Sequence, residues 1–377
     1  MLRLPLICAT LCATVLAQQP GQVSVVISFK DQISQDVLAG FGIQATKTLF
    51  GAEAVTASVP ASLVANLRRH GDIETVDLNH IASAYGPGNG GGGGPGGGGP
   101  GGGGGGSAPQ TTPPGITRVG GSVSVTNVTV AILDTGIDLD HPDLQANIVG
   151  DVNFVKNGAG DDDNGHGSHC AGVVAAVDNT VGVVGITNAS LLAVKVLDRR
   201  GSGSYADIVS GINWAASNGA DIISMSLGGG ASTASLQTAC NNASSSILLV
   251  AAAGNDGDCD LNTNEINYPA YYSSVVSVGA TSTDAASYDA LMCFSSSNPD
   301  VELSAPGHNV NSCWKSGGYR VENGTSMACP HVAGCAAALW SGSPNNVLNT
   351  LINYSDDAGP AGHDNGWGHG VAEHVNT

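Results

Sequence analysis

Three short segments of the chain carry side chains that together can activate a serine hydroxyl. Asp134 follows the apolar run VTVAIL, His166 stands between glycines in NGHGSH, and Ser326 lies in GTSMACP. A serine hydroxyl is a poor nucleophile until an imidazole takes its proton, and a carboxylate must hold that imidazole in one tautomer. These residue types therefore predict nucleophilic acyl transfer, provided that the fold brings them together.

Each segment also has a simpler structural interpretation. An Asp after an apolar strand is often a turn residue, and a Ser before an apolar helix is often only an N-cap. His166 and His169 could instead bind zinc, but the sequence lacks the intervening Glu of a zincin helix and any obvious third ligand. The combination favours catalysis, because Asp, His and Ser each lie at the edge of a different predicted element.

The elements that must position these residues are apolar strands alternating with helices. We predict strands at 128–133, 191–197, 221–227, 247–252 and 275–280, and helices at 166–177, from Ser204 onward and at 326–340. Continuous apolar strands that alternate with helices predict an α/β domain with a doubly wound, mostly parallel sheet flanked by helices. In such a sheet, functional residues lie at the carboxyl ends of the strands.

A smaller domain precedes this one. Its pattern predicts strands at 23–29, 46–50, 54–59 and 73–79 and helices at 32–39 and 61–70, a βαββαβ order typical of an α+β ferredoxin-like domain. Residues 86–106 are almost entirely Gly, interrupted by Pro87, Asn89, Pro95 and Pro100. Because such a segment cannot bury side chains, we interpret it as a linker.

The first 17 residues have the features of a secretory signal peptide. Arg3 precedes a short apolar run that ends in Val15-Leu16-Ala17, a small-x-small cleavage pattern. The run is shorter than the ~20 residues that span a bilayer. We therefore expect a secreted, extracellular protein with a signal peptide (1–17), a small domain (18–85), a Gly-rich linker (86–109) and a large domain (110–377).

The composition excludes some partners. Asp and Glu total 31 against 12 Lys and Arg, a formal net charge of −19. Such a surface repels nucleic acids and anionic membranes, so we expect neither as a partner. Of nine cysteines, Cys8 and Cys12 fall within the signal peptide, and the odd number that remains leaves at least one thiol unpaired in a monomer.

From DTGID through NGHGSHCAG to GTSMACPHVAG, the chain resembles the subtilisin family of serine proteases (subtilases), in particular its proteinase K-like branch. The resemblance covers about residues 22–85 and 110–377, and the order Asp, His, Ser is that of subtilisin. It implies a monomeric serine endopeptidase that forms an acyl-enzyme with protein or peptide substrates, with no organic cofactor.

Two other functions make different demands on the sequence. An esterase or lipase would need a G-x-S-x-G elbow and the order Ser, Asp, His, and neither is present. A pseudoprotease that acts only as a binding scaffold would lack a catalytic or oxyanion-hole residue, and none is missing.

The resemblance also implies the residues that contact the substrate. The segment AAAGN matches the oxyanion-hole motif of the family, so the Asn255 amide and the Ser326 N–H should face the developing oxyanion. Residues 226–228 and 201–203 resemble segments of the family that pair with an extended peptide. Such main-chain pairing favours broad specificity. We expect large apolar residues at the cleaved position. The substrate-binding residues are Ser226, Leu227, Gly228, Gly201, Ser202, Gly203 and Gly254.

The small domain resembles the inhibitory propeptide of the family, and its last residues, 79–85, resemble the tail that lies in the active site. We therefore expect the propeptide to act as an intramolecular inhibitor and the precursor to cleave itself after Tyr85. In the family the catalytic domain usually begins directly after this tail. Here the Gly-rich linker intervenes.

The resemblance further implies a structural Ca²⁺ site, with side-chain ligands from Gln110, Asp143 and Asn179 and backbone oxygens from Val177, Val181 and Val183. Glu302 stands where a second, weaker site has an acidic ligand. Cys170 should lie beneath the catalytic imidazole as a free thiol. We favour a Cys259–Cys293 disulfide, although six cysteines besides Cys170 allow fifteen pairings that the sequence cannot distinguish.

Overall fold

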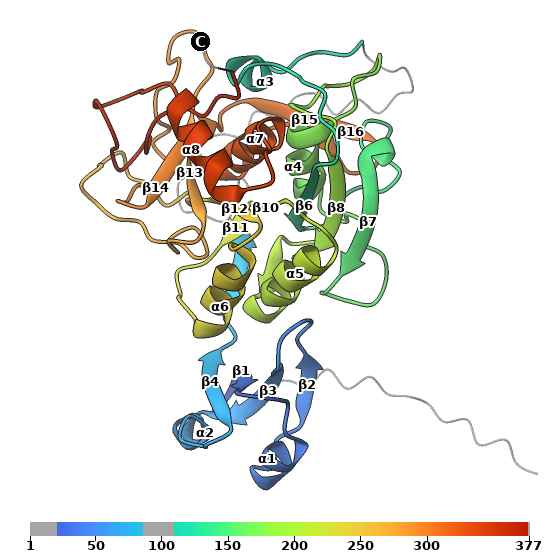
Figure 1. The fold of residues 1–377 in the computed structure, drawn as a ribbon, viewed down its shortest axis with the longest axis vertical. Coiled ribbons are helices and arrows are strands. Elements are labelled where there is room, and N and C mark those ends of the chain that lie inside the picture. Colours follow the sequence, from blue (N-terminus) through green and yellow to red (C-terminus); the bar gives the residue numbers. More distant parts are fainter. Residues whose placement is uncertain (1–20, 86–108, 376–377) are drawn as a thin grey trace, which may run out of the picture.

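The computed structural model describes residues 21–85 and 109–375, which form a small and a large domain stacked along the long axis of the molecule (Figure 1). The predicted signal peptide and all of the predicted linker except Pro109 lie outside these residues. No helix within the described ranges is both long and apolar enough to cross a bilayer.

The large domain is built on a seven-stranded sheet in the order β14-β13-β12-β10-β6-β8-β7, and every neighbouring pair in it is parallel. The prediction of a doubly wound, mostly parallel sheet is confirmed. The strands are β6 (Thr129–Asp134), β7 (Ile148–Asn153), β8 (Ser190–Lys195), β10 (Ile222–Met225), β12 (Leu248–Ala252), β13 (Val276–Thr281) and β14 (Val301–Pro306).

Helices cover both faces of this sheet. Along β6, Val130 and Ile132 face one hydrophobic cluster, whereas Ala131 and Leu133 face the other. This alternation explains why a central strand must be apolar at every position. The first face packs against α4 (His166–Ala175), α7 (Thr325–Ala338), α8 (Pro344–Tyr354) and the short α3 (Pro114–Arg118), and the second against α5 (Tyr205–Ser217) and α6 (Ala234–Ala243).

Smaller elements complete the large domain. The hairpin of β15 (Val310–Trp314) and β16 (Gly318–Glu322) packs against α4. Gln145–Asn147 forms a 3-10 turn, η2. The predicted strand 221–227 is interrupted at Ser226, so that β10 stays in the central sheet and β11 (Leu227–Gly228) leaves it to join a second, three-stranded sheet.

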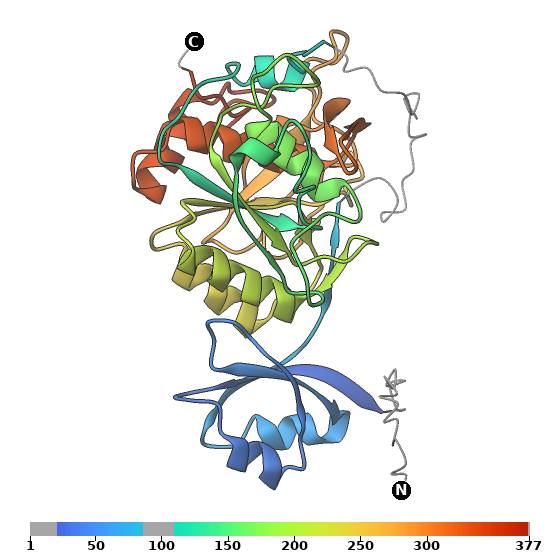
Figure 2. The ribbon, with the colours of Figure 1, turned by 90° about the vertical axis from the view of Figure 1, so that its right-hand side faces the viewer.

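The small domain has the predicted βαββαβ order, and its antiparallel sheet, β2-β3-β1-β4, keeps β1 and β3 at the centre. Two helices cover the sheet face that points away from the large domain, and the other face is turned toward α5 and α6 (Figure 2). The elements are β1 (Gln22–Phe29), α1 (Gln35–Gly40), β2 (Ala45–Thr48), β3 (Ala54–Pro60), the 3-10 turn η1 (Ala61–Leu63), α2 (Val64–Leu67) and β4 (Ile73–Leu78).

Polar contacts join the two domains at the amino-terminal ends of α5 and α6. The Asp77 carboxylate accepts a hydrogen bond from the Ser235 N–H at 2.8 Å, and the Asn79 Oδ1 accepts one from the Ala206 N–H at 3.1 Å. Both donors lie in first helical turns, whose amides lack helical acceptors. Lys47 adds an ion pair with Asp207. The small domain therefore caps two helices of the large one.

Leu133, the residue before Asp134, offers a test of the central packing. Its side chain is 0% exposed between the sheet and α5. We expect Leu133→Ala to lower the free energy of unfolding by about 2–5 kcal/mol, because it leaves a cavity in a close-packed core. Guanidinium unfolding measures the change. Val149→Ala in β7 is the control, since Val149 is 62% exposed, and an equal loss there would contradict the prediction.

Candidate active site

Asp134 and His166 come from adjacent elements and form a buried pair. Asp134 is the last residue of β6 and His166 the first of α4, and they are 0% and 4% exposed. The His166 Nδ1 lies 2.8 Å from the Asp134 Oδ1 and 2.9 Å from the Oδ2. The carboxylate therefore holds a proton on Nδ1 and leaves Nε2 free to act as a base.

The short distance between Asp134 and His166 requires glycine where α4 crosses the chain that follows β6. A Cβ on Gly167 would lie 2.0 Å from the Gly136 carbonyl oxygen, and a Cβ on Gly136 would lie 2.3 Å from the Gly160 carbonyl oxygen. The residue before His166, Gly165, has φ +117°, a conformation that glycine adopts readily. The flanking glycines of the histidine motif thus set the distance between the imidazole and its carboxylate.

Asp162 fixes the start of α4, and the sequence analysis did not identify it. Its Oδ1 accepts hydrogen bonds from the Gly165 N–H and the Thr135 Oγ1, both at 2.9 Å. Its Oδ2 accepts bonds from the Ser168 N–H at 3.0 Å and the Ser168 Oγ at 2.6 Å. One buried carboxylate therefore connects the end of β6 to the first turn of α4. The signal for it was an acidic run directly before a helix.

Ser326 lies in the first turn of α7, but its hydroxyl does not bond to His166. The Ser326 Oγ donates to the Ser226 carbonyl oxygen at 3.1 Å, and the buried His166 Nε2 has no hydrogen-bond partner among the described residues. The Ser326 N–H is one of the first-turn amides that have no acceptor within a helix. The helix start thus presents the hydroxyl and a free amide together.

The electrostatics favour the charged imidazole. Burial lowers the pKa of His166, but the Asp134 carboxylate more than compensates, so the pKa is raised above its usual 6.5. Cys170, one helical turn later, lies 3.8 Å from the Asp134 Oδ2 and 3.5 Å from the Ser326 carbonyl oxygen. Burial raises the pKa of this thiol well above its usual value. The thiol is therefore neutral and is not a competing nucleophile.

Asn255 follows β12 and points its amide at a backbone carbonyl. The Asn255 Nδ2 donates to the Tyr85 carbonyl oxygen at 2.8 Å. The Asn255 Oδ1 accepts from the Thr325 N–H at 3.0 Å and the Thr325 Oγ1 at 2.9 Å, which fixes the orientation of the amide. A Cβ on Gly324 would lie 2.5 Å from the same carbonyl oxygen. The sequence analysis did not identify Thr325.

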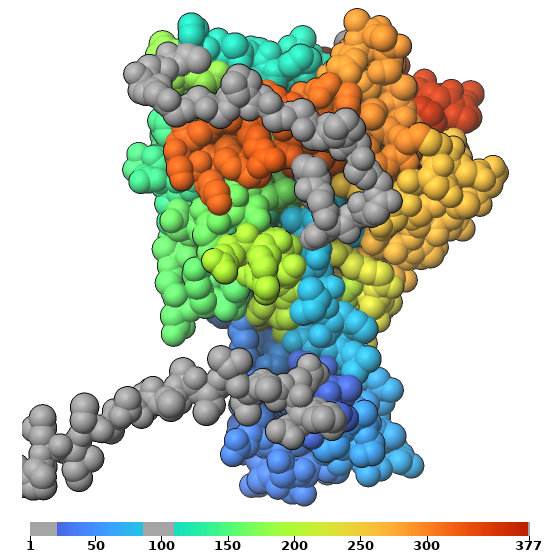
Figure 3. Space-filling model, turned by 180° about the vertical axis from the view of Figure 1, so that it is seen from behind, coloured from blue at the N-terminus to red at the C-terminus, as the bar shows by residue number. Residues whose placement is uncertain are grey.

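The tail of the small domain lies as a strand between two strands of the large one. β5 (Ile81–Ala84) pairs antiparallel with β11 on one side and with β9 (Ser202–Ser204) on the other, and Figure 3 shows the light-blue tail rising from the small domain into the large one. The Ala84 N–H donates to the Gly201 carbonyl oxygen at 2.8 Å. Leu227, Gly228, Gly201, Ser202 and Gly203 therefore contact an extended peptide.

Ser226 and Gly254 lie at the site without pairing with β5. The Ser226 Oγ donates to the Ser326 carbonyl oxygen at 2.8 Å, and the Gly254 N–H donates to the Thr325 Oγ1 at 3.3 Å. The side chain of Tyr85 lies next to Gly228, where a Cβ would come within 2.2 Å of the tyrosine oxygen. Burial, followed by the Asp256 charge, raises the pKa of Tyr85 well above its usual value.

The predicted Ca²⁺ ligands lie together around the loop after α4. The Asn179 Nδ2 donates to the Asp143 Oδ1 at 2.7 Å, and the Gln110 Oε1 accepts from the Asn179 N–H at 2.8 Å. Backbone bonds also bring in Val181, which donates to the Asn179 Oδ1 at 2.7 Å, and Val177, which donates to the Asp143 carbonyl oxygen at 2.8 Å. The Glu302 Oε1 lies 3.7 Å from the His369 Nε2.

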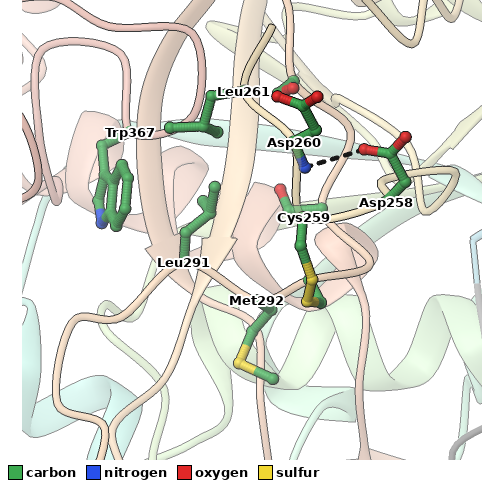
Figure 4. Close-up of a pocket in the computed structure, with 10 residues that line it drawn as sticks. Asp258, Cys259, Asp260, Leu261, Leu291, Met292 and Trp367 are labelled. Atoms are coloured by element: carbon green, nitrogen blue, oxygen red, sulfur yellow. Dashed lines mark hydrogen bonds between the residues drawn. A yellow bond between two sulfur atoms is a disulfide. The ribbon is translucent and has the colours of Figure 1, made fainter. Parts of the chain in front are cut away.

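The predicted Cys259–Cys293 disulfide is confirmed. It lines a small pocket beside Leu261, Leu291, Met292 and Trp367, with the carboxylates of Asp258 and Asp260 at its edge (Figure 4). Asp134, His166 and Ser326 do not line this pocket. Five cysteines in the described part of the chain are buried free thiols, namely Cys170, Cys240, Cys313, Cys329 and Cys335.

A parallel α/β domain that holds an Asp–His pair beside a helix-borne serine, with an amide donor for a carbonyl oxygen, has the components of a serine hydrolase. The model of the subtilase family matches residues 126–370. The chain therefore belongs to the subtilase family and is a serine endopeptidase with Ser-His-Asp chemistry.

The curated relatives agree with this membership. The chain is 46% identical to subtilisin DY of Bacillus licheniformis over 241 residues, which cover 61% of this chain and 85% of the relative. It is 37% identical to subtilisin E of Bacillus subtilis over 349 residues, 87% of this chain and 84% of the relative. An intracellular serine protease of Paenibacillus polymyxa is 48% identical over 219 residues, 56% and 66% of the two chains. Assignment to the proteinase K-like branch stays a prediction.

Asn255 offers a test of the site geometry. We expect Asn255→Ala to lower kcat by about 10²–10³ with little change in KM, the loss that follows removal of one oxyanion-hole donor in subtilisin itself. Steady-state hydrolysis of a chromogenic peptide measures both constants. Asn241→Ala, at an exposed position of α6, should behave like the wild type. A rise in KM alone for Asn255→Ala would show that the amide only binds the substrate.

Proposed function

We propose that this protein is a secreted endopeptidase in which Ser326 is the nucleophile, His166 the general base and Asp134 the residue that orients the imidazole. The observation that carries the proposal is the Tyr85 carbonyl group. It ends an extended strand seated between β9 and β11, and its oxygen accepts a hydrogen bond from Asn255 beside the helix that bears Ser326. A peptide carbonyl thus lies where acyl transfer would take place.

In the reaction, the Ser326 hydroxyl turns from the Ser226 carbonyl oxygen toward the His166 Nε2, which has no other partner in the described ranges. The imidazole takes the proton as the oxygen attacks the carbonyl carbon, and then protonates the leaving amine. The Asn255 Nδ2 and the Ser326 N–H stabilise the oxyanion. Water then attacks the acyl-enzyme by the same steps, and the carboxylic acid product is released.

The pairing of β5 supports broad specificity with a preference for a large apolar residue at P1. Leu227 pairs with Ala84, and Gly203 with Ala82, through main-chain groups that every peptide offers. The Tyr85 ring packs partly buried against the hydrophobic core, and its buried hydroxyl has no hydrogen-bond partner within residues 21–85 and 109–375. Such buried surroundings favour large apolar side chains over charged ones.

We further propose that residues 18–85 are an inhibitory propeptide and that the precursor cleaves itself after Tyr85. The contacts that hold the tail in the active site continue into the capping contacts of Asp77 and Asn79 on α6 and α5. The tail is thereby bound as an extended substrate would be. Export rests on the predicted signal peptide. We expect the mature enzyme to be a monomer that acts on proteins and peptides.

A structural Ca²⁺ ion fits the residues predicted to hold it. Asn179 is within hydrogen-bond distance of both Gln110 and Asp143, so the oxygens of the three side chains can converge on one ion. In the described arrangement, the Asp143 Oδ2 accepts bonds from the Val183 N–H at 3.1 Å and the Tyr319 hydroxyl at 2.8 Å. A bound ion would replace these donors and tie three separate segments together, with backbone oxygens of Val177, Val181 and Val183 as further ligands.

Self-processing can be tested with the full-length precursor. We expect the wild-type chain to yield a protein that begins at Gly86 and the Ser326→Ala chain to stay intact, because cleavage needs the hydroxyl of the same molecule. Amino-terminal sequencing and intact-mass measurement show the outcome. Ser277→Ala, at a buried serine of β13, is the matched control and should mature normally. Ser326→Ala protein cut after Tyr85 would point to another protease.

The calcium proposal predicts a change in active lifetime. We expect a chelator to shorten the half-life of the wild type at elevated temperature, since an ion bound only by the folded state at 100 times its Kd adds about 2.7 kcal/mol. Asp143→Asn should respond little to the chelator. Asp300→Asn, which alters an exposed carboxylate, should respond like the wild type. Equal chelator responses of the wild type and Asp143→Asn would refute the site.

A further inference from the structure

The β15–β16 hairpin ends in a buried carboxylate to which the mechanism above gives no role. Glu322, the last residue of β16, is 3% exposed and pairs across the hairpin with Val310. The partner of its carboxylate is Arg320, whose Nε lies 2.6 Å from the Glu322 Oε1. A buried charge is costly unless something nearby stabilises it. Glu322 lies across the hairpin from Val310, whose carbonyl oxygen is hydrogen-bonded to His169 of α4.

His169 attaches the hairpin to α4 one turn after His166. The His169 Nε2 donates to the Val310 carbonyl oxygen at 3.0 Å and to the Arg320 carbonyl oxygen at 3.1 Å. The Ser312 Oγ donates to the His169 carbonyl oxygen at 2.8 Å. Burial, and then the neighbouring His166, lowers the pKa of His169 to about 3. The imidazole that anchors the hairpin therefore stays neutral wherever the enzyme can work.

Trp314 fixes the other side of this arrangement. The Trp314 ring lies so close to Gly165 that a Cβ on Gly165 would come within 2.2 Å of it. The Arg320 guanidinium lies 4.5 Å from the centre of the same ring, a favourable cation–π contact. Arg320 has a half-exposed side chain and Glu322 a buried one. Water therefore screens the positive charge more than the negative one.

We propose that Glu322 is a positioning residue that stabilises the charged imidazolium of His166 while the acyl group is transferred. The inference rests on the proposed function, because it assigns a role only if His166 carries the proton. Four other ionisable side chains face the imidazole: Asp134 from β6, Asp162 from the loop before α4, and His169 and Cys170 from α4.

Among the acidic groups, Glu322 is the one that can be altered without breaking a bond to α4. Asp134 bonds to the imidazole itself, and Asp162 bonds to the backbone at the start of the helix. Burial lowers the pKa of His166, and the charges that raise it are those of Asp134, then Asp162, then Glu322. In return, His166 and Arg320 offset part of the rise that burial gives to the pKa of Glu322.

The test compares a change of charge with a change of shape at the same position. Glu322→Gln keeps the shape and removes the charge, so a smaller fraction of His166 is protonated at pH values where Glu322 is ionised. We expect the acidic limb of kcat/KM to move to lower pH, and the fraction of plateau activity kept at pH 5.5 to rise about two- to threefold. Glu322→Asp keeps the charge and should keep the wild-type limb. Asp300→Asn, at an exposed carboxylate, is the control and should not move it.

The salt dependence of the shift and a variant of Arg320 show whether the buried charge of Glu322 causes it. In 1 M salt the Debye length is about 3 Å, so the effect of a buried charge should persist whereas that of an exposed one should disappear. Arg320→Gln alters a half-exposed side chain and provides a second variant should Glu322→Gln not fold. It removes a cation and leaves Glu322 unpaired, so its limb should move to higher pH.

The outcomes distinguish this inference from the proposed function. Labelling of Ser326 by a fluorophosphonate and hydrolysis by the wild type come first, and failure of both would refute the endopeptidase itself. If the wild type is active but the Glu322→Gln limb coincides with it, the inference is wrong. It is also wrong if Glu322→Asp moves the limb as far as Glu322→Gln, or if Arg320→Gln moves it to lower pH.

Discussion

The close packing of α4 on the chain that leaves β6 is the constraint on which the rest of the structure depends. An imidazole and a carboxylate can share a proton only within about 3 Å, and two ordinary backbones carry side chains that keep them further apart. Gly167 against Gly136, and Gly136 against Gly160, remove those side chains. The Asp134–His166 bond is thus set by the absence of Cβ atoms, and the acidic side chains around it then decide how readily the pair holds a proton.

Backbone groups also determine the contact with a peptide. β11 forms where the chain leaves the central sheet at Ser226, and β9 follows the turn at Gly201. Between them is the width of one strand, which β5 occupies. The tail is therefore held along its length by backbone pairing, and the Tyr85 side chain lies next to Gly228. A peptide bound in this way has its carbonyl placed by its whole length, which is the positional advantage that catalysis requires.

Much of the fold could be predicted from the sequence, because β6, α4 and α7 each carry a strong local pattern next to a chemical group. The prediction was weaker where a pattern was short or mixed. At the two edges of the sheet, β7 has no buried residue and β14 carries Glu302 within an otherwise buried run, unlike the continuous apolar runs of the centre. The Cys259–Cys293 disulfide could be suggested from the sequence, but the other pairings of the cysteines could not be excluded. Asp162 could have been found from the acidic run before α4, whereas no local pattern marks Thr325 or Glu322, whose partners Asn255 and His166 are distant in sequence.

If the small domain is the propeptide, the structure also indicates why cutting the chain would not by itself release an active enzyme. Among the described residues, the contacts that hold the small domain and its tail include the pairing of β5 with β9 and β11, the caps from Asp77 and Asn79, and the ion pair of Lys47, all at or before Tyr85. Breaking the bond after Tyr85 removes none of them. Strand pairing and helix capping are each worth only about 1 kcal/mol per bond, but they act together while the small domain stays folded. Release therefore depends on the stability of that domain, whose own core is a single small cluster centred on Ile27 and Leu67.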